Sequence, residues 1–504
     1  RRIVRERGMD RYDFAHDKLR EVAYNSLSAA HRHLLHRRVA EAMTAVYAQG
    51  NGMESRKTEL DSVSGQIAAH YELAGLFVEA VPFYLRAAEA AQRLYANEEA
   101  IDAYHHALAL LEGPIGGPSA QIANVSEKLG DLFSLISQYG EARSQYLRVS
   151  TRSDSLDRLD LARFQRKIGN TWREQYDYSQ ARQAYQLAEA YLGELVNTTT
   201  EYAQKWWQEW VQIQLEIDLV HYWLAEIEAS VELQNRIQPL VEQYGTLAQQ
   251  ATFFQRRGQL EFRRQRSVAN DRALHDMQRS FALWQQAGLL NATPSTYFML
   301  GFILLWHIDL QDEAGASVGD DLETAKQALT QALQSAEASA DLSLQTRALT
   351  YLAIAQRRSN NLPETEKVAL RALDVAGRSQ MKEYIAMAKA NLAWLAWRNG
   401  KDETTQTLGK DALDLWHQLP LTHASVPFQW TVLLPLLASD LQHEDVERAI
   451  ENARTLLDPH LQELPTALTT QLEQAVQSWD GGATLSALQF LQQAISVAQQ
   501  LHYL

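Results

Sequence analysis

Arginine and aromatic side chains recur at matching positions of successive segments in this sequence. They stand one, four or five residues after a small residue such as Gly169, Gly258, Ala353 or Ala393. A guanidinium forks onto carboxylate or phosphate, and aromatic rings bury a large area at low entropic cost, so both types are enriched at binding surfaces. We therefore predict a groove for an acidic or planar partner on the concave face of a helical array, formed by Asn170, Arg173, Gln259, Phe262, Arg263, Trp306, Arg357, Arg358, Trp394, Trp397 and Arg398.

Packing is the alternative role for these side chains, because their long stems also cover apolar surface on a neighbouring helix. The same two interpretations apply to Trp206 and Trp210, which share one face of a helical stretch. They form either a stacking platform for a ligand or part of the core.

No residue set has the spacing of a catalytic or metal site. The chain contains no cysteine, which excludes a disulfide, a thiolate metal site and a cysteine nucleophile. Residues 407–411 come nearest to a phosphate-binding loop, but they lack its leading glycine and its hydroxyl residue. His33 and His36 share a helical face without a carboxylate to complete a ligand set. We predict no catalytic residue, metal ligand or cofactor in this chain; a helical enzyme using scattered histidines and carboxylates is the alternative.

The elements that position the predicted surface are helical repeats. Residues 166–192 contain Gly169, Trp172, Tyr178 and Tyr185 in the tetratricopeptide pattern, with small residues where two helices approach closely. A matching unit has its glycine at Gly130, 39 residues earlier. That step exceeds the roughly 34 residues of the standard repeat, so we expect longer helices or connections.

The repeats predict an all-α, tetratricopeptide-like solenoid, a right-handed superhelix of about ten helix pairs. Strand signals are nearly absent. Expected domains are residues 1–47, outside the repeat; 66–112, the first helical repeats; 119–290, further repeats; and 291–504, repeats with a C-terminal capping unit. Interruptions are expected at residues 48–65, 112–119 and 309–320, which are rich in glycine, proline, serine or charge.

Charge and composition exclude two classes of partner. The 504 residues include 47 Lys and Arg against 62 Asp and Glu, a formal net charge of −15. A field of this sign repels phosphate backbones, so nucleic acid is not expected as a partner. The longest apolar run, residues 297–306, is about half of what a membrane-spanning helix needs. We predict no membrane association and, because cysteine is absent, a cytoplasmic protein.

The N-terminal motifs resemble those of a known family. Tyr12-Asp13-Phe14-Ala15-His16-Asp17, then Ala23-Tyr24-Asn25-Ser26-Leu27 and the stretch from His31 to Ala40 resemble the end of the winged-helix module of the signal-transducing STAND ATPases. In that family these motifs lead into a tetratricopeptide sensor arm. Residues 69–75 and 86–91 also look like the family's first repeats.

The resemblance implies a non-catalytic sensor and regulatory arm. Its ATPase module, with ATP or ADP and Mg²⁺, would lie upstream, and the lack of an initiator methionine suits a piece of a longer protein. The implied partners are an effector protein, peptide or small molecule, a sugar among them, together with the upstream module and, on activation, a second copy. The alternative is a free-standing tetratricopeptide scaffold that docks acidic peptides.

Overall fold

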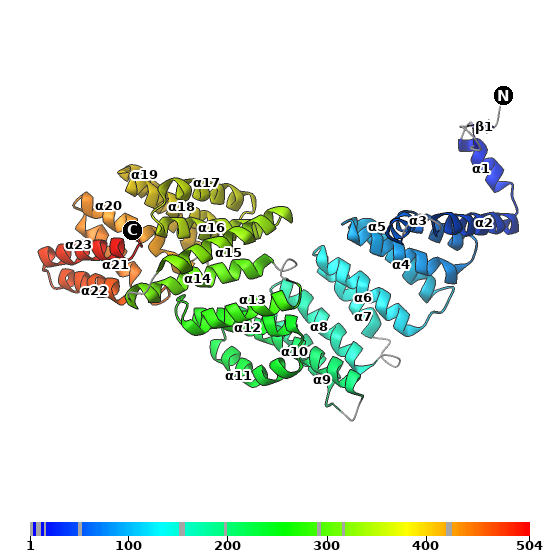
Figure 1. Ribbon diagram of the computed structural model, residues 1–504, viewed down its shortest axis with the longest axis horizontal. Coiled ribbons are helices and arrows are strands. Elements are labelled where there is room, and N and C mark those ends of the chain that lie inside the picture. The colour runs from blue at the N-terminus through cyan, green and yellow to red at the C-terminus, as the bar shows by residue number, and fades with distance from the viewer. Residues whose placement is uncertain are drawn as a thin grey trace. The chain divides into compact units, whose positions relative to one another are not determined.

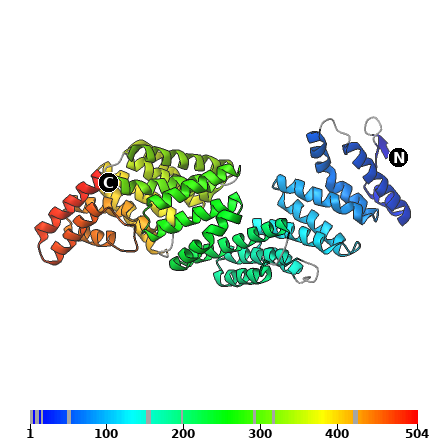
Figure 2. The ribbon, with the colours of Figure 1, turned by 60° about the horizontal axis from the view of Figure 1, so that its bottom comes forward.

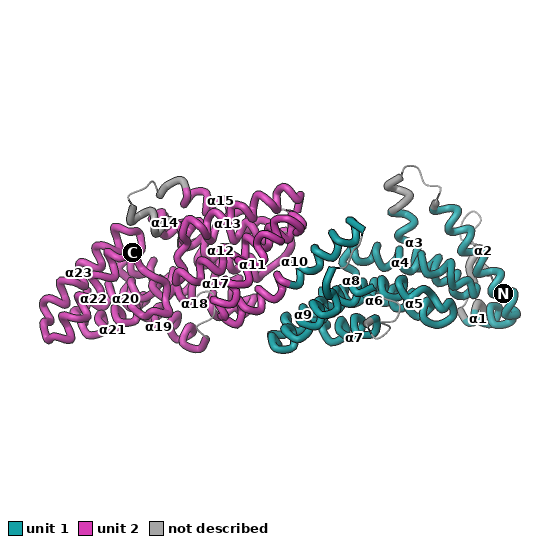
Figure 3. The backbone as a smooth tube through the Cα atoms, turned by 90° about the horizontal axis from the view of Figure 1, so that it is seen from below, with its two compact units in different colours: residues 1–213 teal, residues 214–504 magenta. Residues whose placement is uncertain are grey.

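The computed structural model describes residues 4–6, 12–14, 17–48, 53–150, 157–195, 199–289, 294–314, 318–419 and 426–504. Within these ranges the protein contains 23 α-helices, a 3-10 helix and one short pair of strands (Figure 1). The fold is an all-α helical repeat of the tetratricopeptide type, as the sequence predicts. Two compact units divide the chain, residues 1–213 and 214–504, with the boundary inside a helix (Figure 3).

Unit 1 begins with a strand pair and continues as helices. Strand β1 (Val4–Glu6) pairs antiparallel with β2 (Tyr12–Phe14). The helices that follow are α1 (Asp17–Asn25), α2 (Ala29–Ala48), α3 (Met53–Leu73), α4 (Phe77–Arg93), α5 (Asn97–Glu112), α6 (Ser119–Leu135), α7 (Tyr139–Ser150), α8 (Arg158–Glu174), α9 (Tyr178–Leu192) and the first part of α10 (Thr200–Trp223).

Unit 2 is helical apart from its connections. Its helices after α10 are α11 (Ile227–Tyr244), α12 (Leu247–Arg264), α13 (Asp271–Gln286), α14 (Pro294–Ala314), α15 (Val318–Ala338), α16 (Leu342–Arg358), α17 (Leu362–Arg378), α18 (Lys382–Arg398), α19 (Asp402–His417), α20 (Trp430–Gln442), α21 (Val446–Leu456), α22 (Thr466–Asp480) and α23 (Thr484–Gln500). A 3-10 helix (Val426–Phe428) precedes α20.

Close approach between paired helices explains the repeat pattern. A Cβ atom on Gly169 of α8 would lie 2.4 Å from the ring of Tyr185 on α9, and one on Gly130 of α6 would lie 2.5 Å from Tyr146 on α7. Only glycine leaves room for these rings. The turn between α8 and α9 is held by Asp177, whose side chain accepts a hydrogen bond of 3.0 Å from the backbone N–H of Gln180 at the start of α9.

Unit 2 joins segments that are far apart in sequence. The connection between α21 and α22 reaches the turn between α12 and α13, where the Glu463 N–H donates to the Arg266 carbonyl at 3.0 Å. Beside it, Gln462 Nε2 donates to the Ser267 carbonyl at 2.8 Å. The C-terminal end of the described chain lies beside α20, in the orange and yellow part of the ribbon (Figures 1 and 2). Early and late repeats of this unit therefore share one core.

Three local expectations need correction. The expected interruption at 112–119 is confirmed, but α3 covers most of 48–65 and helices α14 and α15 cover most of 309–320. The polar residues of 48–65 do not interrupt the helix: Glu59 and Ser62 lie on an exposed face of α3, which tolerates them. Residues 315–317 lie outside the described ranges. The N-terminal part also contains the strands β1 and β2 besides its helices. Each strand is too short to show an alternating pattern in the sequence.

No helix in the described part of the chain combines the length and apolarity that crossing a membrane requires. The domain limits expected from the repeats stay predictions.

Candidate binding site

Three helices of unit 2, α14, α16 and α18, bring predicted binding residues together. Trp306 comes from α14, Arg357 and Arg358 from the last turn of α16, and Trp394 from α18. Successive members of this helix set pack on one another as well as on their own second helices. Two later segments, residues 426–431 and 503–504, complete the surroundings of these side chains.

Arg357 lies at the centre of this arrangement and is 2% exposed. Its Nη1 donates to the Thr431 carbonyl at 2.8 Å and its Nη2 donates to the Tyr503 carbonyl at 2.6 Å. The guanidinium carbon lies 4.9 Å from the ring centroid of Trp394 and 5.2 Å from that of Trp430, which are cation–π distances. We call Arg357, Trp394, Trp430 and Tyr503 the Arg357 cluster.

The Arg357 guanidinium has no acidic partner among the described side chains, and its Nε donor has no acceptor there. Burial, followed by the charges of Arg358 and Arg398, holds the pKa of Arg357 well below its usual range. Arginine nevertheless stays protonated in proteins. A buried charge without a counter-ion costs several kcal/mol. A negative charge bound beside Arg357 would therefore be stabilising.

Trp306 is fully buried beside this cluster. Its ring stacks on Phe428 with centroids 4.5 Å apart and planes 7° from parallel. The indole N–H groups of Trp306, Trp394 and Trp397 have no acceptor in the described part of the structure. Each unsatisfied buried donor costs about 1–3 kcal/mol. The region is therefore rich in donors that a ligand with acceptor atoms would satisfy.

The other predicted residues make contacts of several kinds. Arg358 is 5% exposed, with its guanidinium carbon 5.0 Å from the Tyr503 ring centroid, and Arg398 lies over Trp394 at 5.3 Å. In α12, Phe262 meets Phe302 edge to face and Arg263 donates to the Tyr222 carbonyl at 2.6 Å. Gln259 Nε2 lies 3.3 Å from the sulfur of Met299.

Asn170 and Arg173 belong to unit 1. The Asn170 side chain accepts a hydrogen bond from Tyr185 at 2.8 Å, and Arg173 pairs with Glu174 at 2.6 Å. Most of the eleven predicted side chains are thus buried or half-buried in this structure. Their binding role stays a prediction. Some of them, such as Arg357, also contact residues far along the chain and not only the neighbouring helix.

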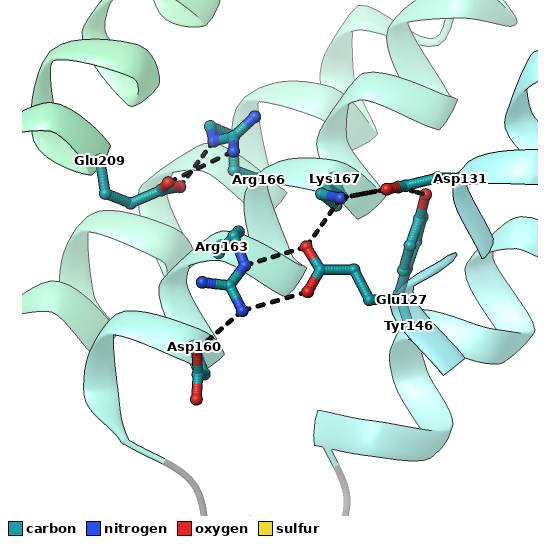
Figure 4. Close-up of polar contacts among 8 residues, drawn as sticks. All are labelled: Glu127, Asp131, Tyr146, Asp160, Arg163, Arg166, Lys167 and Glu209. Atoms are coloured by element: carbon teal, nitrogen blue, oxygen red, sulfur yellow. Dashed lines mark hydrogen bonds and ion pairs between the residues drawn. The ribbon is translucent and has the colours of Figure 1, made fainter. Parts of the chain in front are cut away.

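A row of ion pairs joins α6, α8 and α10 and was not predicted from the sequence (Figure 4). We call these ion pairs, formed by Glu127, Asp131, Arg163, Arg166, Lys167 and Glu209, the charge ladder. Arg163 holds Glu127 with two hydrogen bonds, Nε at 2.9 Å and Nη2 at 3.1 Å. Lys167 bridges Glu127 at 2.8 Å and Asp131 at 2.7 Å, and Arg166 holds Glu209 at 2.6 Å. The sequence signal that could have revealed the ladder is the presence of opposite charges 36 residues apart, a spacing close to the repeat step.

The ladder satisfies its own charges. Burial acts to raise the pKa of Glu127, but Lys167 and Arg163 outweigh burial and lower it. Each charged group in the ladder faces an opposite charge, so the ladder joins successive repeats and offers little unpaired charge to a ligand. The unsatisfied donors of unit 2 make the Arg357 cluster the stronger candidate site.

Trp206 is a core residue. It is 7% exposed, and its indole N–H donates to the Leu192 carbonyl at 3.2 Å. Trp207 meets it edge to face, with ring centroids 4.9 Å apart. These contacts favour the packing interpretation over a stacking platform.

His36 of α2 contacts His70 of the first repeat. His36 Nδ1 lies 2.8 Å from His70 Nδ1 of α3, and Tyr24 OH lies 2.8 Å from His36 Nε2. No group of three or more potential metal-binding side chains occurs in the described ranges.

Acidification is expected to weaken the contact between α2 and α3. Burial, then His70, His33 and Arg32, lowers the pKa of His36 below its ordinary 6.5. The folded state therefore binds fewer protons than the unfolded chain, so stability is present above pH 6.5 and is lost as the pH falls below it. We expect the loss to stay below about 1 kcal/mol because the side chain is partly exposed.

Thermal melts between pH 7.5 and 5 test this, with His36→Gln expected to flatten the pH dependence and the exposed His417→Gln expected to leave it unchanged. Equal pH dependence of His36→Gln and the parent chain would contradict the prediction.

Comparisons with known proteins add little beyond the fold. No protein-family model matches the chain. An uncharacterized protein of Rhizobium meliloti is 35% identical over 107 residues, which cover 21% of this chain and 10% of that protein. The match spans too little of either protein to show a family.

Several solved structures are similar in fold. One is the signal transduction ATPase with numerous domains (STAND) protein with a tetratricopeptide repeat sensor from Pyrococcus horikoshii, 14% identical, covering 94% of this chain and 67% of that chain at a TM-score of 0.49. NprR in complex with its cognate peptide NprX is 12% identical, covering 66% and 88% at 0.46. The human IFIT1 dimer with PPP-AAAA is 13% identical, covering 94% and 96% at 0.43. Similarity at this level carries no argument about ligands.

Proposed function

We propose that this chain is the non-catalytic sensor and regulatory arm of a larger STAND-type protein. An effector binds the arginine and aromatic side chains of unit 2, and binding changes how the arm contacts an upstream nucleotide-binding module. Such a switch requires the effector to bind two arm states with different affinity. The effector's class is an acidic protein, peptide or small molecule, and the protein is cytoplasmic.

The observation that carries the proposal is the donor-rich core around Arg357. Structural cores satisfy their donors, and a buried arginine that lacks a counter-ion destabilises the protein that contains it. A buried guanidinium whose Nε has no acceptor in the described structure favours a binding role over packing alone. The N-terminal motifs support the regulatory context, and so do the exposed apolar side chains of α1 and α2, because such surface is commonly covered by another part of a protein. These side chains are Val22, Leu34, Leu35, Val39 and Val46, all at least 40% exposed.

The regulatory role is tested in the longer gene product. The coding sequence upstream of Arg1 is read for a strand followed by Gly-x-x-x-x-Gly-Lys-Ser/Thr. If the motif is found, ATP turnover of the longer protein is compared with that of a version ending at Ala48. Allosteric coupling of ordinary size predicts a change of at least about fivefold. Absence of the motif, or equal turnover, would contradict the proposal and leave the scaffold that docks acidic peptides.

A further inference from the structure

We propose that Arg357 anchors a carboxylate-binding site in unit 2, and that residues 503–504 occupy this site in the present structure, so that a ligand carboxylate binds by displacing them. The inference rests on the proposed function, because it names the ligand chemistry of the same surface. It follows from the way this chain uses its arginines.

Three other arginines define how a carboxylate is held in this protein. Arg163 binds Glu127, Arg166 binds Glu209, and Arg257 binds Asp276, each through the Nε and Nη2 atoms on one edge of the guanidinium. This two-point contact matches the spacing of carboxylate oxygens. The same edge of Arg357 carries a single backbone carbonyl, that of Tyr503, on Nη2, while Nε has no acceptor in the described structure. Of the two donors that would hold a carboxylate, Nη2 of Arg357 has an acceptor and Nε does not.

The surroundings favour an anion at this edge. Arg357, Arg358 and Arg398 are close enough for each neighbour to lower the pKa of Arg357. No acidic side chain is among the groups that shift the pKa of Arg357. The rings of Trp394 and Trp430 both lie within cation–π distance of the guanidinium. An entering carboxylate would supply the missing charge and the second acceptor together, which a neutral carbonyl cannot do.

The covering segment is held by a local turn and by its own side chain. After α23, His502 has a φ of 58°, and the Tyr503 N–H donates back to the Ala498 carbonyl at 2.8 Å. This helix-ending turn directs Tyr503 inward, where its ring lies 4.5 Å from that of Trp430. The segment follows the last helix of the unit, and its side chains are buried, with Tyr503 1% and Leu504 7% exposed. Displacement by a ligand would therefore also expose these two side chains.

The test uses a peptide with the sequence of residues 500–503, acetyl-Gln-Leu-His-Tyr, whose terminal carboxylate replaces the Tyr503 carbonyl. The peptide is titrated, as the free acid and as the amide, into a variant that lacks residues 500–504. Calorimetry gives the Kd, and the summed tryptophan fluorescence provides a second reading of binding. We expect the acid to bind at least tenfold more tightly than the amide, and the intact chain to bind the acid at least tenfold more weakly than the shortened variant.

The Arg357→Lys variant distinguishes the effect of the paired guanidinium donors from that of the positive charge. Lysine keeps the positive charge but lacks the paired donors, so the ratio of acid to amide affinity is expected to fall below threefold. Arg163→Lys is the matched control, because Arg163 uses the same edge on its own Glu127 in unit 1, and it should keep the full ratio. Circular dichroism and thermal melts confirm that each variant is folded.

Tyr503→Ala in the intact chain is the second variant, in case the shortened chain fails to fold. It removes the ring packing on Trp430 and keeps all backbone atoms, so peptide affinity should rise above that of the parent. Equal affinity for acid and amide, no binding by either folded variant, or a ratio that survives Arg357→Lys would overturn the proposal.

A further arm with N-acetyltyrosine distinguishes a small carboxylic acid from a peptide terminus. Binding as tight as that of the peptide assigns the site to small acids, and tighter binding of the peptide assigns it to peptide ends; both outcomes support a carboxylate site. Failure of the nucleotide-switch test leaves these titrations unaffected, so the two proposals fail separately.

Discussion

Replacing Trp306 by alanine is expected to lower the free energy of unfolding of unit 2 by about 3–5 kcal/mol. The side chain is fully buried, stacks on Phe428 and meets Phe302 and Tyr351 edge to face. Alanine would leave a large cavity between α14 and the 426–428 segment, and a packed interior closes such cavities only in part. Denaturant unfolding monitored by circular dichroism measures the loss.

Trp306→Phe is the matched control. Phenylalanine keeps an aromatic ring against Phe428 and removes the indole N–H that has no acceptor among the described atoms. Its cost should be less than half that of alanine. A stability of Trp306→Ala within about 1 kcal/mol of the parent would show that Trp306 is not a core residue, and would favour a surface role for it.

Gly169→Ala is expected to destabilise unit 1 by about 1–3 kcal/mol, although alanine is the better helix former. The new Cβ would lie 2.4 Å from one carbon of the Tyr185 ring and 2.7 Å from the next. Tyr185 cannot move aside easily, because it is fully buried and its hydroxyl donates to Asn170. Helix α9 must therefore shift away from α8. The melting temperature of the chain measures the effect.

Gly140→Ala provides the comparison in the same unit. Gly140 lies in the first turn of α7, and a Cβ there would meet nothing within 4 Å. Without a clash, the helix preference of alanine should raise stability by up to about 1 kcal/mol. Equal effects of the two substitutions would mean that the close approach of α8 and α9 is not what requires glycine at 169.

The sequence by itself determined the fold class and the pairing of helices. Gly130 and Gly169 recur at the repeat step because each faces a tyrosine of the next helix, and this contact is local in the chain. Periodicity reports such contacts directly, since both partners lie within one repeat. The recurrence of arginine and tryptophan at matching positions of the repeats could also be recognised in the sequence.

Only the tertiary structure decided which of these residues meet and how far they are buried. Arg357 finds its acceptors 74 and 146 residues away, at Thr431 and Tyr503, and no repeat period encodes these distances. Trp306 likewise stacks on Phe428, from a segment outside the repeats. Contacts between distant repeats depend on how the helix pairs stack and on where the connecting segments run. The residue types of the proposed site were therefore visible in the sequence, while their contacts with Thr431, Phe428 and Tyr503 were not.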